Sequence, residues 1–117
     1  MKLSLSWPAK ELSPNSRTHW AQRAKAAKAY RSEAWAKAWA AYQPFCLLDK
    51  AITVSLLFHP PDKRRRDLDN MLSSMKPALD GISDAIGVDD QHFSLRIQRG
   101  EPTKGGRVAV EIIGEQA

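Results

Sequence analysis

The feature that most constrains the fold is a strict alternation of residue types over residues 52–58. The alternate positions are apolar, namely Ile52, Val54, Leu56 and Phe58, and two of the three residues between them are polar. A period of two places successive side chains on opposite faces of a β-strand, so this segment predicts a strand with one buried face. Pro60 and Pro61 end the strand, because proline donates no backbone hydrogen bond.

A helical repeat follows over residues 68–86. Its apolar residues are spaced by four and three positions: Leu68, Leu72, Met75, Leu79, Ile82 and Ile86. This spacing lines one face of a helix and predicts that the face is buried. Pro77 and Gly81 interrupt the repeat, so we expect a kink near residues 73–77. Gly87 predicts the end of the segment.

A second helix is predicted from residue 17 or 18 to about residue 42, where the chain is rich in Ala, Lys and Arg and contains neither Gly nor Pro. Pro44 is expected to close it. Trp35, Trp39 and Tyr42 recur at helical spacing, which predicts that they pack on a sheet or on a partner.

Further alternating segments predict strands at residues 2–7, 93–97 and 108–112. The last two are joined through residues 101–106, which favour a hairpin because they contain Gly105 and Gly106. We therefore expect residues 1–117 to form one α/β (α+β) domain. Its sheet is expected to be four-stranded, mixed or largely antiparallel, and packed with two helices.

The length of 117 residues suits a single domain with a buried core. No apolar run approaches the roughly 18 residues of a membrane span, and the N-terminal segment lacks a signal-peptide pattern, which favours a cytoplasmic protein without membrane contact. Cys46 is a lone cysteine, so an internal disulfide and a Cys-based zinc site are excluded. We expect it to be a small buried or half-buried apolar residue.

The charge of the chain is unevenly distributed. The net charge of +5 favours a polyanionic partner, because neutralising phosphates releases counterions. Seven of the eight Asp residues, however, fall within residues 62–90, beside the basic run of residues 63–66. Bare carboxylates repel phosphates, and a divalent cation bound between the carboxylates and the phosphates would offset this repulsion.

The acidic residues of this stretch allow a metal site or plain capping. The side chains of Asp67 and Asp69 lie on the same side of the chain only if the backbone is extended before Asp69, so that Asp67 precedes the helix. The position directly before a helix is also the one at which an Asp caps the helix. At about 100° per residue, Asp69, Ser73 and Lys76 share one edge of the apolar stripe. Asp80 shares this edge but lies about 16 Å from Asp69, so we expect a surface charge there. Asp89 and Asp90 follow Gly87-Val88 and fit either turn residues or ligands that fold back.

This ordered set resembles the RusA-type Holliday junction resolvases. The resemblance is carried by residues 62–70, by Lys76, by the sequence Leu79-Asp80-Gly81-Ile82, by Asp89-Asp90 and by residues 103–107, and it extends to the segments ending in Trp7-Pro8 and Arg17. It implies a homodimeric, Mg²⁺-dependent endodeoxyribonuclease that nicks two strands of four-way junction DNA symmetrically. By position, Asp67, Asp69 and Asp90 match the family's essential carboxylates, and Lys76 matches its essential lysine.

One departure concerns that lysine. The more familiar members carry it four residues after the second Asp, at the position of Ser73 in this chain. Lys76 comes three residues later, together with its flanking pattern, which indicates an insertion of nearly one helical turn.

On this hypothesis the acidic residues bind Mg²⁺, namely Asp67, Asp69 and Asp90, with Asp89 as an alternate ligand or a residue behind the ligands. Lys76 stabilises charge on the phosphate or orients the water. The cations expected to position DNA phosphates are Lys63, Arg64, Arg65, Arg66, Arg17, Lys104 and Arg107. His19, His59 and His92 lack ligand spacing and are expected to be structural or exposed.

Two other functions fit the same residues. A non-catalytic basic module would bind branched or duplex DNA and use its Asp residues only as caps and turns. A protein-interaction subunit would dock a partner on its Trp-rich helix. If the chain does cut two strands together, it needs two active sites and therefore a C2 dimer. The candidates for that interface are Phe93, Leu95 and Trp35 or Trp39, which fit an ordinary place in the core as well.

Overall fold

The computed structural model describes residues 1–42 and 52–114. The elements run in the order β1 (Lys2–Ser6), η1 (Lys10–Leu12), α1 (Trp20–Ala41), β2 (Ile52–His59), α2 (Leu68–Ser73), α3 (Lys76–Ile86), η2 (Asp90–His92), β3 (Phe93–Arg99) and β4 (Arg107–Gly114). Each predicted strand is present. The predictions for Pro44 and Cys46 lie outside the described residues.

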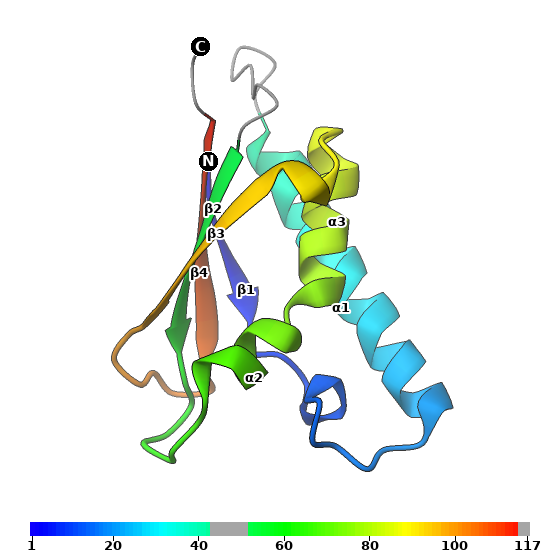
Figure 1. Ribbon diagram of the computed structural model, residues 1–117, viewed down its shortest axis with the longest axis vertical. Helices are drawn as coiled ribbons and strands as arrows, with labels where there is room; N and C mark the ends of the chain where they lie inside the picture. Colours follow the sequence, from blue (N-terminus) through cyan, green and yellow to red (C-terminus); the bar gives the residue numbers. More distant parts are fainter. Residues whose placement is uncertain (43–51, 115–117) are drawn as a thin grey trace.

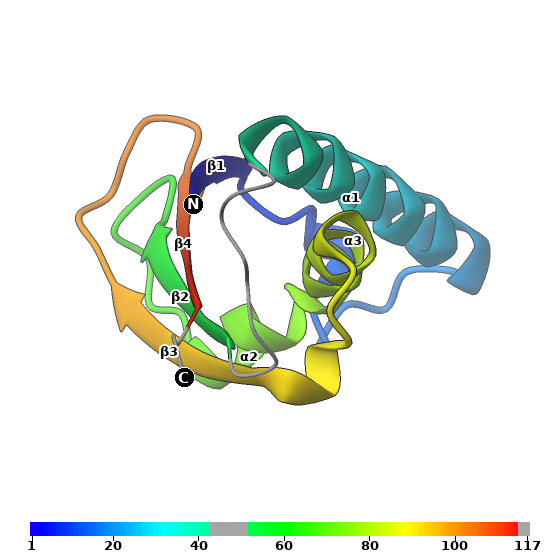
Figure 2. The same ribbon diagram turned by 90° about the horizontal axis from the view of Figure 1, so that it is seen from above.

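The four strands form one mixed sheet in the order β1-β4-β2-β3. β4 pairs antiparallel with both β1 and β2, whereas β3 pairs parallel with β2. The helices lie on one face of this sheet, with α1 and α3 side by side (Figures 1 and 2). The expected α+β fold with a four-stranded mixed sheet is therefore confirmed.

The predicted hairpin between the last two strands is wrong, because β2 lies between β4 and β3. The connecting residues pass across the end of β2 and bond to it. The amide of Gly100 donates to the Phe58 carbonyl at 2.8 Å, and that of Thr103 donates to the Pro60 carbonyl at 2.9 Å. Gly105 and Gly106 have positive φ angles of 79° and 72°, as a turn requires, but the turn belongs to this longer crossing.

The core lies between the helices and the inner face of the sheet. Every second residue of β2 is buried, and Leu56 and Phe58 are fully inaccessible to solvent. Met75 and Ile82 contribute from the helical side. The predicted apolar stripe and the predicted buried face of β2 thus pack against each other, and each such side chain stabilises the fold by about 1.5–3 kcal/mol.

The predicted kink is confirmed as a complete break between two helices, so the chain has three α-helices in its described part instead of the expected two. α2 ends at Ser73 and α3 begins at Lys76. Pro77 lies in the first turn of α3, where its missing N–H removes no helical hydrogen bond. Gly87 ends α3 with a φ of 72°, as predicted.

α1 differs from the prediction at its start and on its aromatic face. It begins at Trp20, where the His19 ring Nδ1 accepts a hydrogen bond from the Ala21 amide at 3.2 Å. The buried residues of α1 are Tyr30, Ala34 and Ala38. Trp35 and Trp39 stack on each other and are 43% and 59% exposed, so these two side chains do not pack on the sheet, and their packing on a partner stays a prediction. Tyr42 is partly buried against the core. Within the two described ranges, no helix has the length and apolar character needed to cross a membrane.

Candidate functional site

The two acids at the start of α2 are exposed and are not used as caps. Asp67 occupies the N-cap position with an extended backbone, yet its carboxylate makes no capping hydrogen bond. Asp69 lies in the first helical turn, and its carboxylate has no hydrogen-bond or ion-pair partner among the described residues. Helix capping therefore does not account for Asp67, and both carboxylates are open to a ligand.

Lys76 contacts Asp90 from a different element. Its Nζ atom donates to Asp90 Oδ2 at 2.5 Å and lies 3.1 Å from Asp80 Oδ1. The hydrogen bond to Asp90, and then that to Asp80, raises the pKa of the Lys76 ammonium. The bond from Lys76 holds the pKa of Asp90 below its usual value. The fold thus brings together the predicted lysine and the third predicted carboxylate, which are 14 positions apart.

Asp80 is more than the isolated surface charge expected from the sequence, because it is half-buried and paired with Lys76. The signal was present in the sequence: a Lys and an Asp four residues apart face each other on a helix. Asp89 adopts one of its two predicted roles, since its carboxylate accepts the Gln91 amide at 3.0 Å and caps η2.

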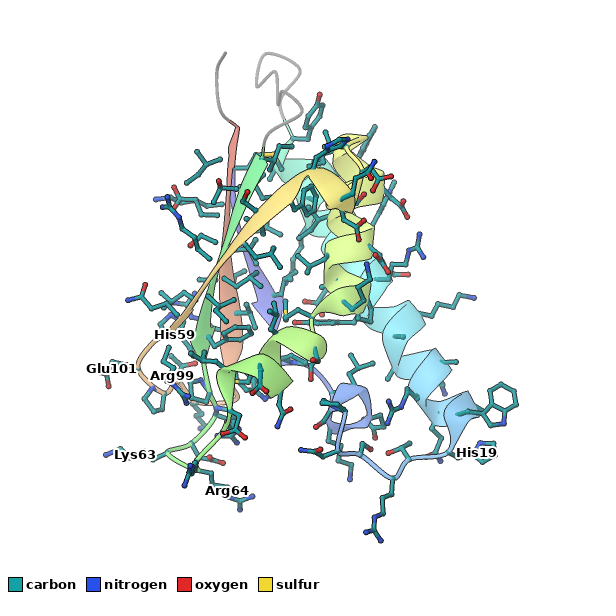
Figure 3. The ribbon with its side chains drawn as sticks, viewed as in Figure 1. His19, His59, Lys63, Arg64, Arg99 and Glu101 are labelled. Carbon is teal, nitrogen blue, oxygen red and sulfur yellow. The ribbon has the colours of Figure 1, made fainter. Side chains whose placement is uncertain are left out.

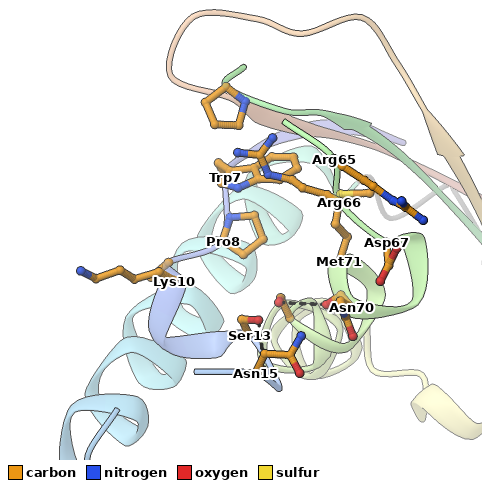
Figure 4. A pocket seen from close by; sticks show the side chains of 13 residues that line it. Trp7, Pro8, Lys10, Ser13, Asn15, Arg65, Arg66, Asp67, Asn70 and Met71 are labelled. Carbon is orange, nitrogen blue, oxygen red and sulfur yellow. Dashed lines mark hydrogen bonds between the residues drawn. The ribbon is translucent and has the colours of Figure 1, made fainter. Parts of the chain in front are cut away.

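The predicted acids are divided between two hollows. Asp67, Asn70 and Arg65 line a cleft of about 640 Å³ between the segment after β1 and the β2–α2 connection (Figure 4). A second hollow of about 480 Å³ is lined by Asp80, Asp84, Asp89 and Asp90 together with Arg31. Asp69 lies on α2, two residues after Asp67.

The oxygen donors suit Mg²⁺ in kind, because this ion prefers carboxylate ligands. Their placement does not gather them: across residues 1–42 and 52–114, no three His, Cys, Asp or Glu side chains are grouped as a metal site. The lysine ammonium is also held directly against Asp90. The predicted ligand set Asp67, Asp69 and Asp90 therefore stays a prediction.

The basic run of residues 63–66 lies in the β2–α2 connection, where Lys63 and Arg64 extend away from the body of the molecule (Figure 3). Arg66 is different, because it is held in place. Its guanidinium bonds to Asp62 at 2.8 Å and lies over the Trp7 ring, and its carbonyl accepts a bond from Arg99. Arg66 therefore shapes the connection, whereas Lys63, Arg64 and Arg65 present exposed cations.

The remaining predicted cations, Arg17, Lys104 and Arg107, are also exposed. Sequence reasoning missed Asp62, whose pKa is lowered by the Arg66 side chain and the Arg64 amide. Its spacing of four residues from Arg66 was no signal by itself, because no helix was expected there. The histidines behave as predicted where the structure tests them: His59 donates through Nδ1 to the Glu101 carbonyl at 2.8 Å, and His19 caps α1.

Comparisons with known proteins show sequence similarity to two proteins that are described below. No family model matches it. An uncharacterized protein from Xylella fastidiosa (strain Temecula1) is 40% identical over 115 residues, which cover 96% of this chain and 75% of that protein. The crossover junction endodeoxyribonuclease rusA of Enterobacteria phage HK97 is 36% identical over 62 residues. That match spans 52% of this chain and half the length of the phage protein, so the chain is similar to a junction endonuclease over about half its residues.

Proposed function

We propose that this chain is a structure-selective endodeoxyribonuclease that resolves Holliday junctions by paired, symmetric, Mg²⁺-dependent phosphodiester hydrolysis in DNA recombination and repair. The observation that carries the proposal is the 36% identity to a crossover junction endodeoxyribonuclease. On this view residues 1–117 form one RusA-like endonuclease domain that acts in the cytoplasm on four-way junction DNA as a homodimer.

The local chemistry supports this proposal. Asp67, Asp69 and Asp90 would hold Mg²⁺, and Asp89 would stand behind them or replace one of them. When bound, the ion would supply an activated water and charge stabilisation at phosphorus. Lys76 contributes a fixed positive charge beside Asp90, suited to a phosphate oxygen on which negative charge develops.

The basic surface supplies positioning. Lys63, Arg64 and Arg65 are exposed on the connection that leads directly into Asp67, so a DNA backbone bound by them would pass the acids of α2. Phosphate contacts of this kind hold a strand in register without reading its sequence. Arg17, Lys104 and Arg107 would extend the same surface, and Arg66 would act by shaping the connection.

The test is a cleavage assay on a synthetic four-way junction and on a linear duplex of the same arm sequence, each with and without Mg²⁺. The wild-type chain should cut only the junction, in opposed strands, and only with Mg²⁺. Asp69→Asn should bind the junction as the wild type does and lose cleavage by at least two orders of magnitude, a loss that fits a transition-state role. Retained cleavage by this variant would sink the assignment.

Glu111→Gln is the matched control. Glu111 is exposed on β4 and lies between the buried residues Val110 and Ile112, so it is on the sheet face away from the helices. The same exchange of carboxylate for amide at this position should leave both binding and cleavage unchanged.

A second candidate is a non-catalytic module that binds branched or duplex DNA. It is favoured by the Lys76 ammonium lying against Asp90 and by the division of the acids between two hollows. It predicts salt-sensitive binding to junction and duplex alike, with no Mg²⁺-dependent product on any DNA substrate.

A further inference from the structure

A third hollow, of about 510 Å³, lies between α1 and the start of α3, and it shares Lys76 and Asp80 with the site described above. We call it the α1/α3 groove. Its apolar lining residues are Leu12, Ala24, Ala27 and Pro77. Its basic lining residues are Arg23, Lys28, Arg31 and Lys76, and Ser73 and Asp80 complete the lining. A groove lined by apolar residues, four cations and one acid suits a ligand that carries several negative charges on an organic backbone.

Two of the four cations have no carboxylate partner among the described residues. Arg31 pairs with Asp84, and Lys76 pairs with Asp80 and Asp90. Arg23, by contrast, donates to the carbonyls of Ser13 and Ser16, which orient the guanidinium without neutralising it. Lys28 is exposed and has neither a hydrogen bond nor an ion pair within the described ranges.

The α1/α3 groove is continuous with the candidate site. Lys76 and Ser73 line the groove, and Lys76 reaches Asp90 in the acidic hollow. Arg31 and Asp80 line both the groove and that hollow. A strand lying against Lys76 therefore has a path along α1 that leads away from Asp89 and Asp90.

An exposed indole lies at the N-terminal end of α1, beyond the residues that line the groove. Trp20 is 75% exposed, the highest value of the large apolar residues in the described part of the chain. It precedes Arg23 and Ala24 by three and four residues, so it projects from the side of α1 that lines the groove. Basic grooves that end in exposed aromatic rings bind unpaired nucleotides, because a base stacks on the ring while the backbone meets the cations.

We propose that the α1/α3 groove binds the sugar–phosphate backbone of a DNA strand that leaves the candidate site, and that Trp20 stacks on an unpaired base of that strand. The inference rests on the proposed function for the identity of the ligand. It adds a contact surface on α1 that is separate from the basic run of residues 63–66. An acidic protein segment would use the cations but would have no base for Trp20.

The first experiment measures DNA affinity of the full chain against salt, using a fluorescent four-way junction without Mg²⁺. Lys28→Ala should reduce the slope of log K against log salt by about one, the loss expected for one phosphate contact. Lys2→Ala is the control, since Lys2 is exposed on β1 and lies on the outer face of the sheet. If the two variants have equal slopes while the wild type binds DNA, the proposal that the groove binds DNA is wrong.

The second experiment tests stacking with a single-stranded oligonucleotide and a fully paired duplex. Trp20→Ala should weaken single-strand binding by roughly 5- to 150-fold, while Trp20→Phe restores most of it and duplex binding is unchanged. Equal effects on both DNAs would contradict stacking. Competition by poly-glutamate as strong as that by DNA, with Trp20→Ala silent, would assign the groove to an acidic protein segment and overturn the proposal.

The two proposals fail in different ways. If Lys28→Ala and Trp20→Ala bind DNA like the wild type while Asp69→Asn loses cleavage, only the proposed role of the groove is wrong. If the wild-type chain neither binds nor cuts DNA, both the proposed function and the proposed role of the groove are wrong.

Discussion

At the scale of single residues, the contact between Lys76 and Asp90 gives the molecule a defined response to pH. The pKa of Asp90 is lowered by the hydrogen bond from Lys76, and the pKa of Lys76 is raised, first by Asp90 and then by Asp80. An Asp whose pKa is lowered by folding stabilises the fold at pH values above the pKa that it has in the unfolded chain, and this stabilisation is lost as the pH falls through its pKa in the folded state. A Lys whose pKa is raised by folding stabilises the fold at pH values below its unfolded-state pKa, and this stabilisation is lost as the pH rises through its folded-state pKa.

We therefore predict that Asp90→Asn lowers the free energy of unfolding by a small amount between about pH 4 and pH 10, the ordinary Asp and Lys values. The effect is small because both side chains are partly exposed to solvent. The gap to the wild type should close below pH 4, as Asp90 is protonated. Denaturant titrations across pH measure it, with Glu101→Gln as a control at an exposed acid. A gap that persists to pH 2 would show that the pair is not its cause.

The residue scale also shows why the site was only partly predictable. The motif from Arg64 to Asn70 located the acids of α2, and Lys76 was selected through its flanking residues. The contact of Lys76 with Asp90 depends on how η2 packs beside α3, which no local pattern encodes. Arg66 carries the same charge as Arg65, and only tertiary contacts with Asp62 and Trp7 separate their roles.

At the scale of elements, the break between α2 and α3 explains how the later lysine still reaches an acid. Lys76 lies seven residues after Asp69, and the break falls between them. Because of the break, α3 does not have to continue in the direction of α2. Lys76, at the start of α3, therefore contacts Asp90 and does not lie on the same helical edge as Asp69. The expectation from helical angles that Asp69 and Lys76 share one continuous face therefore does not apply.

The packing of α3 on α1 gives a prediction at Gly81. A Cβ atom at this position would overlap the Arg31 carbonyl oxygen and crowd the Trp35 amide. Alanine ordinarily stabilises a helix relative to glycine by about 1 kcal/mol. We predict the opposite sign: Gly81→Ala should lower the free energy of unfolding by about 1–3 kcal/mol, as forced overpacking does. Urea denaturation measures this, and a neutral or stabilised variant would contradict the close approach.

Gly87→Ala separates backbone strain from packing. Gly87 has a φ of 72° with no atom within 4 Å of the added Cβ, so alanine there is strained but not crowded. It should cost about 1–2 kcal/mol, and asparagine, which tolerates this conformation, should recover part of the loss.

Elements were predictable where periodicity is local, and strand order was not. The alternation of residues 52–58 and the stripe of residues 68–86 located β2, α2 and α3 because burial of one face leaves a repeat in the sequence. The glycines at residues 105 and 106 do form a turn, as their positive φ angles show. Which strands that turn joins is decided by β2 lying between them, a fact of tertiary pairing.

At the scale of the whole molecule, the proposed paired cleavage predicts a homodimer. β3 is an edge strand, most of its residues are exposed, and Leu95 is 42% exposed. We predict that sedimentation of the wild type gives twice the mass of 13.1 kDa. If β3 forms the interface, Leu95→Lys should shift the chain to a monomer and abolish opposed cuts made within one binding event.

Ile113→Lys is the matched control, because Ile113 is 41% exposed but lies on the outer face of β4. It should leave the dimer intact. A monomeric wild type would contradict the dimer, and a dimer insensitive to Leu95→Lys but sensitive to Ile113→Lys would move the interface to the outer face of the sheet.

The strand order has a consequence for biosynthesis. Within residues 1–42 and 52–114, β1 pairs with β4 alone, and the Met1 amino group donates to the Ile112 carbonyl across 111 positions of sequence. During synthesis on the ribosome, β1 therefore has no strand partner within the described residues until residues 107–114 have emerged. Such long-range pairing slows folding, because the entropy of closing the whole loop is lost before the favourable contacts between the strands form. β1 is consequently expected to join the sheet only after residues 107–114 have been synthesised.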